Sequence, residues 1–172
     1  ATVVRSGCMA KDADMILSEF ILLGIGGKEL SEENAAQTAK ALNIIQPDFI
    51  RVHATGIKLE SKLGEFVRDG SFTLQSEEEI VIEQKLFLQQ LHEMDSYYVN
   101  EHIVNLLLEV RGNLRTEKQE MLSTIDRFLT LPPDERLLFT VGRRLNIFFR
   151  LDDLKKPKLH QKAGESLQQI LS

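Results

Sequence analysis

The residues with the clearest chemical potential form a glycine turn, Leu23-Gly24-Ile25-Gly26-Gly27-Lys28-Glu29. Bare backbone of this kind admits a phosphate group, a ligand ring or a neighbouring strand. A phosphate-binding loop would need Gly at position 22 and Ser or Thr at position 29, where this chain has Leu22 and Glu29. A dinucleotide fingerprint starting at Gly24 would also need Gly at position 29. Neither phosphate motif is present, which leaves two alternatives: a ligand-binding turn, or a structural turn that needs positive φ angles.

A second group of polar candidates alternates along one predicted strand, namely Arg51, His53 and Thr55. Alternation places the three on one face of the strand. If the strand belongs to a barrel, this face points inward to a ligand, and otherwise it points to solvent. Both alternatives stay open.

His102 and Asn105 are three residues apart in a helix predicted over 101–110, so they would share one helix face. A substrate-binding or metal-binding role is conceivable for them in a larger enzyme. Metal sites usually need three protein ligands, and only Glu101 and His92 are further donors by sequence. A hydrogen-bonded structural histidine is therefore the favoured interpretation of His102.

Composition restricts the class of protein. With 172 residues, 42% of them hydrophobic, the chain can bury one sizeable core. It has no run of about eighteen apolar residues and no secretory pattern, so we expect a cytoplasmic protein without membrane partners. The single cysteine, Cys8, excludes an internal disulfide and any cysteine-only zinc or iron–sulfur site within this chain.

Charge is distributed unevenly along the chain. The net charge is -5, yet residues 136–172 hold eight Lys or Arg against three acidic residues. A solvated face is the usual explanation of such a basic tail. A nucleic-acid or phosphate partner is the less favoured alternative.

The elements around the glycine turn predict a βαβ unit. Four consecutive apolar residues, 20–23, form a buried strand over 19–24 with both faces covered. Ser31 is placed as the N-cap of the next helix, with acidic residues in its first turn. A second strand covers Phe49–Ala54. Residues 1–17 show no clear period.

The remaining chain reads mainly as helices separated by short turns. We predict helices over 59–68, from Ser76 as N-cap, over 101–110, over 117–129, from Pro132 and Pro133, and through 159–171. Residues 97–99 form either a short strand or an extended entry into the 101–110 helix. The fold class is therefore α/β, with one βαβ unit followed by a helical extension.

Taken together, the order of these features resembles a known family. A strand, Gly-x-x-Gly, an acidic helix start, Pro47-Asp48-Phe49-Ile50-Arg51, then Leu63, Gly70, Phe72 and a Glu-rich helix resemble the C-terminal portion of radical S-adenosylmethionine (SAM) iron–sulfur oxidoreductases. His102-Ile103-Val104-Asn105-Leu106-Leu107, the 118–129 helix and Gly142-Arg143-Arg144 are similar to the tail of that group. The resemblance covers residues 19–154.

The resemblance implies a helix-rich C-terminal part of a partial (β/α) barrel. Residues 1–56 would supply its βαβ part, with the fifth and sixth strands, and residues 57–172 a helical C-terminal extension. The cofactor side would be bordered by six residues, Gly24, Ile25, Gly26, Gly27, Ala54 and Thr55. The substrate side would be formed by Arg51, His53, His102 and Asn105. The full enzyme would use a [4Fe-4S] cluster to cleave SAM reductively and start radical chemistry on a substrate that is either a small molecule or of unknown class.

Two departures from the family pattern matter. The three-cysteine cluster motif is absent, so this chain cannot bind the cluster and is expected to be an inactive C-terminal fragment on its own. Thr55-Gly56-Ile57-Lys58 replaces the usual Pro-Gly-Thr after the sixth strand. The rival hypothesis is a helical protein-interaction or RNA-interaction module without catalysis. A sheet cut from a barrel would also expose an edge, which predicts a homodimer of the fragment.

Overall fold

The computed structural model describes residues 2–58 and 60–171. Its elements, in order, are α1 (Thr2–Asp12), β1 (Ser18–Leu23), α2 (Ser31–Ile45), β2 (Phe49–Ala54), α3 (Lys62–Arg68), α4 (Glu77–Gln90), β3 (Tyr97–Val99), β4 (Gly112–Asn113), α5 (Lys118–Leu129), α6 (Pro133–Arg144), the 3-10 helix η1 (Leu151–Lys155) and α7 (Pro157–Leu171).

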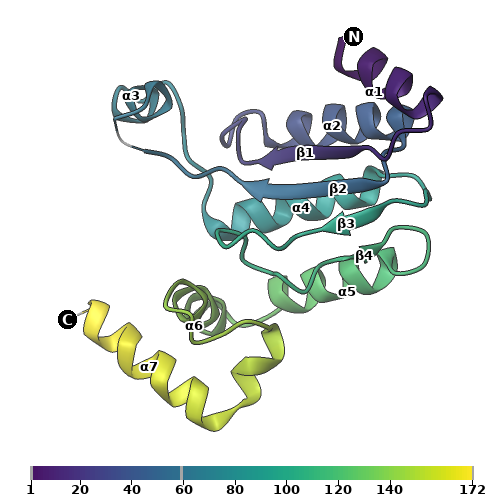
Figure 1. Ribbon diagram of the computed structural model, residues 1–172. Helices are drawn as coiled ribbons and strands as arrows, with labels where there is room; N and C mark the ends of the chain where they lie inside the picture. The colour runs from purple at the N-terminus through teal and green to yellow at the C-terminus, as the bar shows by residue number, and fades with distance from the viewer. Residues whose placement is uncertain (1, 59, 172) are drawn as a thin grey trace.

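The strands form one open, mixed sheet in the order β1-β2-β3-β4 (Figure 1). β1 pairs with β2 and β2 with β3 in parallel, whereas β3 and β4 are antiparallel. The α/β class and both strands of the predicted βαβ unit are confirmed. The sheet crosses the boundary expected at residue 56, because β3 pairs with β2.

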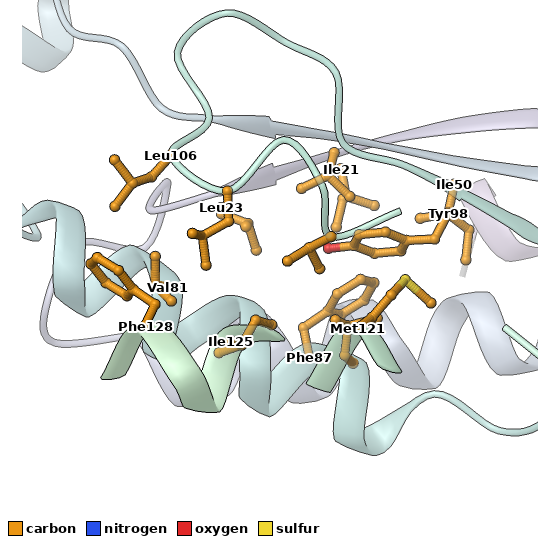
Figure 2. Packing of buried hydrophobic residues seen from close by; sticks show 14 of the residues in the cluster. Ile21, Leu23, Ile50, Val81, Phe87, Tyr98, Leu106, Met121, Ile125 and Phe128 are labelled. Carbon is orange, nitrogen blue, oxygen red and sulfur yellow. The ribbon is translucent and has the colours of Figure 1, made fainter. Parts of the chain in front are cut away.

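Helices α2, α4 and α5 lie along one face of the sheet (Figure 1). Alternate strand residues point into this layer, including Ile21, Leu23, Ile50 and Tyr98, and meet Phe87, Met121 and Phe128 from the helices (Figure 2). All of these side chains are buried. Burial of this apolar area is the main favourable contribution to folding.

The opposite face of the sheet carries no helix among the described residues (Figure 1). Phe20 is 65% exposed and Leu22 40% exposed there. The prediction that both faces of β1 are covered is therefore wrong for this chain. Its continuous apolar run gives one buried face and one bare apolar face, and β1 is also an edge strand.

Two further predictions are corrected, and one helix was not predicted. Residues 101–110 form turns rather than a helix, while 97–99 form β3. Ser31 is the first residue of α2 and not its N-cap; its hydroxyl donates to Glu83 instead. Residues 2–12, for which no element was predicted, form α1, where Gly7 packs against Ile45.

The later helices agree well with the sequence patterns. Ser76 caps α4 through a reciprocal capping box with Glu79, and Pro133 starts α6. Residue 59, where one helix was predicted to begin, lies outside the described residues. The helix observed in this region, α3, begins at Lys62 and is capped by Ser61. None of the helices formed by the described residues combines the length and apolarity needed to cross a bilayer.

Candidate functional site

The glycine turn is tightly occupied by its own chain. Gly24 and Gly27 adopt φ angles of 81° and 63°, a region that L side chains rarely adopt. A Cβ atom on Gly27 would lie 2.8 Å from the Thr73 carbonyl oxygen, and one on Gly26 would lie 2.9 Å from the Leu30 carbonyl oxygen. A Gly26→Val substitution would therefore disturb the turn itself, whether or not a ligand binds there.

The buried carboxyl group of Glu83, on α4, holds this turn in place through hydrogen bonds. It is fully buried, and its two oxygens accept from the Gly24 N–H at 3.1 Å, the Ser31 hydroxyl at 2.8 Å and the Asn34 amide at 2.7 Å. These bonds tie β1, α2 and α4 to one point. This role of Glu83 was not predicted, because in the sequence Glu83 is one more residue of a Glu-rich helix.

The six residues of the predicted cofactor side lie together at the carboxyl ends of β1 and β2. Leu23 pairs with Ala54 in the sheet register, and the Thr55 hydroxyl and N–H both donate to the Leu23 carbonyl, at 2.7 and 2.8 Å. The glycine turn begins at the next residue. Ile25 is 41% exposed, so it offers the apolar contact of this end.

The substrate-side candidates gather beside it on the bare face of the sheet. The rings of His53 and His102 stack with centroids 4.1 Å apart at an angle of 19°, and Phe20 meets His53 edge-on at 5.4 Å. Together with Arg51, Val99 and Glu101, these residues line a hollow of about 240 Å³. Three of the four candidates therefore share one hollow.

Asn105, the fourth candidate, does not line the hollow but binds the backbone of β2 next to it. Its side chain accepts from the Ala54 N–H at 2.8 Å and donates to the Val52 carbonyl at 2.7 Å, so it continues the hydrogen bonding of β2. It also donates to Asn100, whose amide bonds the Leu107 carbonyl. The amide side chains thus replace the ladder partner that a strand would have supplied.

Arg143 of α6 binds residues 100–111, the loop that connects β3 to β4. This arginine is buried, and its guanidinium donates to the carbonyls of Ile103, Asn105 and Leu106 at 3.4, 3.2 and 3.2 Å. Burial and the neighbouring Arg144 lower its pKa. These bonds fix the 100–111 loop and thereby the position of His102 over His53.

Electrostatics in the hollow disfavour a proton on His53. Burial, with additional repulsion from His102 and Arg51, lowers the pKa of the His53 imidazole below its ordinary value. His102 Nδ1 is buried and has no hydrogen-bond partner among the described residues. The unprotonated His53 ring, beside the Arg51 guanidinium, can therefore accept a hydrogen bond, or take a proton when negative charge approaches.

The described side chains do not provide the ligands of a metal ion or an iron–sulfur cluster. Over residues 2–58 and 60–171, no group of three or more His, Cys, Asp or Glu residues is placed to hold a metal ion. Cys8 lies on α1, and a [4Fe-4S] cluster needs several thiolates. The residues of this chain therefore do not fit the cluster.

A larger hollow of about 510 Å³ lies between α5 and residues 149–152. Acidic, basic and apolar side chains line it, and two of them, Arg127 and Asp152, form an ion pair at 2.7 Å. None of the site residues predicted from the sequence lines this hollow.

Comparison with known proteins adds no relative: no family model, no curated protein and no solved structure matches this chain.

Proposed function

We propose that this chain is the C-terminal part of a radical SAM enzyme and that it lines the SAM and substrate side of a partial (β/α) barrel. The observation that carries the proposal is the bare face of the parallel strands. Phe20 and Leu22 are apolar and exposed there, although a continuous apolar run in a parallel strand is typical of strands covered on both faces. A further layer, or the rest of a barrel, would account for this pattern.

The arrangement of polar groups supports the same proposal. In α/β barrels and open α/β sheets, ligands bind at the carboxyl ends of the strands. In this chain the glycine turn, Ala54 and Thr55 lie at that end, and Arg51 and His53 lie on the face that a barrel would turn inward. Helices α2, α4 and α5 lie on the other face, as the outer layer of a barrel would (Figure 1).

In this proposal, SAM and the substrate contact different residues of the chain. SAM would contact the turn through Ile25 and the bare backbone around it, with Ala54 on the other side. The substrate would lie in the hollow between Phe20, His53 and His102. The cluster would have to be bound by residues outside this sequence, and we derive no catalytic step through it.

The full-length protein tests the proposal. We expect the coding sequence before residue 1 to contain a Cys-x-x-x-Cys-x-x-Cys run, and the anaerobically reconstituted protein to release 5′-deoxyadenosine from SAM with dithionite. A coding sequence without such a run, or a reconstituted protein that leaves SAM intact, would contradict it.

A further inference from the structure

Three basic side chains meet in the hollow on the bare face of the sheet. Arg51 and His53 both come from β2, two residues apart and therefore on the same face, and the 100–111 loop stacks His102 on His53. Bringing three groups of this kind together is electrostatically unfavourable, since each can carry positive charge. Such a cluster is stabilised when an anion lies between its members.

No acidic side chain of the described chain serves as that anion. The Arg51 guanidinium donates from Nε to the Ser18 hydroxyl at 3.0 Å and lies 5.7 Å from the Phe49 ring centroid, and it forms no ion pair with a described acid. Glu101 also lines the hollow, but its carboxylate is held by Arg111. The remaining donors of Arg51 are therefore free to bind an oxyanion.

The pKa of His53 reflects its burial and the basic groups around it. Its pKa lies below the ordinary value because of burial, with repulsion from His102 and Arg51 adding to it. These two groups and Glu101 are the charged or titratable residues that line the hollow beside His53. An anion at this position would reverse the repulsion.

We propose that the hollow formed by Phe20, Arg51, His53 and His102 is an anion-binding site for a carboxylate or phosphate group of a small molecule. Guanidinium groups bind both oxyanions through paired N–H donors, and protonated imidazole adds a charge-assisted bond. The exposed ring of Phe20 provides an apolar contact for the rest of the ligand.

The size of the hollow limits the ligand. Its volume of about 240 Å³ corresponds to roughly eight water molecules at about 30 Å³ each, which suits a small acid or one acidic end of a larger molecule. Only the assignment of this anion to the substrate rests on the proposed function. The binding site itself is formed by residues of β1, β2 and the 100–111 loop.

The test follows the four histidines by NMR during pH titrations of the 172-residue chain in acetate, phosphate or chloride at equal ionic strength. An anion that binds the protonated form tenfold more tightly raises the pKa of His53 by about one unit. We expect a rise of about half a unit or more in acetate, in phosphate or in both, relative to chloride. The stronger effect identifies the oxyanion. His160, which lies beside Glu135 on another surface, should not respond.

Variants separate the site from general screening. Arg51→Gln should abolish the anion effect on His53 and Arg51→Lys should weaken it. Arg115→Gln, at an exposed arginine away from the hollow, should leave it intact. No difference between chloride and the other anions, an equal response at His160, or an unchanged response in Arg51→Gln would overturn the proposal.

The same titration with SAM distinguishes this proposal from the proposed function. A SAM effect on Ile25 and Ala54 without an acetate or phosphate effect on His53 would support the function and refute the anion site. Anion binding at His53 in a full-length protein that does not bind SAM would support the anion site and refute the proposed function.

Discussion

Glu83→Ala perturbs the one side chain that connects the glycine turn to the helix layer. The substitution removes both oxygens of a fully buried carboxyl group. The Gly24 N–H, the Ser31 hydroxyl and the Asn34 amide each lose the hydrogen-bond acceptor that these oxygens provide. The Gly24 residue is buried, whereas Ser31 and Asn34 are only partly buried and can turn to water. We therefore count one full penalty for an unsatisfied buried donor, about 1–3 kcal/mol, and about 1 kcal/mol for the emptied space.

The expected loss is about 2–4 kcal/mol of the free energy of unfolding, measured by urea denaturation. A loss of about 3 kcal/mol corresponds to a fall of roughly 6–12 °C in Tm for a chain of this length. Hydrogen exchange at the Gly24 amide should also accelerate, since its acceptor is gone.

Two variants control for loss of charge and for loss of the side chain in general. Glu83→Gln keeps the oxygen that accepts from Gly24 and Asn34, and the Ser31 hydroxyl can accept from the new amide, so we expect a loss of about 1 kcal/mol. Glu78→Ala, on the exposed side of the same helix, removes an ion pair with Arg136 and should cost under about 1 kcal/mol. Equal losses in Glu83→Ala and Glu78→Ala would refute the assigned role of Glu83.

The remaining predictions concern packing and pH. Gly142→Ala places a Cβ atom 2.2 Å from the Phe148 ring and should lower the free energy of unfolding by about 1–3 kcal/mol. In Gly164→Ala, in α7, the new Cβ atom meets nothing within 4 Å, so the free energy of unfolding should rise by up to about 1 kcal/mol. Urea denaturation that finds Gly142→Ala more stable than Gly164→Ala would refute the packing of Phe148 against Gly142. Because the pKa of His53 is lowered in the folded chain, the unfolded chain binds its proton first as the pH falls. The stability from neutral His53 is thus fully present above pH 6.5 and decreases below it, so urea midpoints of the wild type should fall more steeply on acidification than those of His53→Asn.

Local patterns predicted the elements whose signals lie within a few residues. The Ser76 capping box, Pro133 at the start of α6 and the strands around the glycine turn were all readable from neighbouring residues. The same holds for the parallel pairing of β1 and β2, which follows from a helix of sufficient length between two strands.

Errors occurred where long-range contacts override the local pattern. Residues 101–110 have a helical apolar spacing, but Asn105 bonds to β2 and Arg143 takes the carbonyls that a helix would use. Ser31 resembles a helix cap, yet its partner Glu83 lies 52 residues away. α1 contains Gly7 and β-branched residues, and its Gly7 packs closely against Ile45 of α2.

The placement of Arg51 and His53 on one face was predictable from the sequence, but the stacking of the two histidines was not. Alternation placed Arg51 and His53 on one face, and the turn residues were visible as glycines. The stacking of His102 on His53 depends on Arg143, which follows the end of the 100–111 loop by more than thirty residues. No spacing rule in the sequence connects these three residues.

The most direct test of the central claim is the SAM affinity of the full-length, reconstituted protein, measured by equilibrium dialysis with two matched variants. Ile25→Asp puts a charge on the 41% exposed side chain beside the glycine turn, and Ile44→Asp makes the same change on the outer surface of α2, where Ile44 is 55% exposed. We expect Ile25→Asp to raise the Kd for SAM at least about tenfold, equivalent to about 1.4 kcal/mol, with no change for Ile44→Asp. An unchanged Kd in Ile25→Asp would show that this end of the sheet does not border the cofactor.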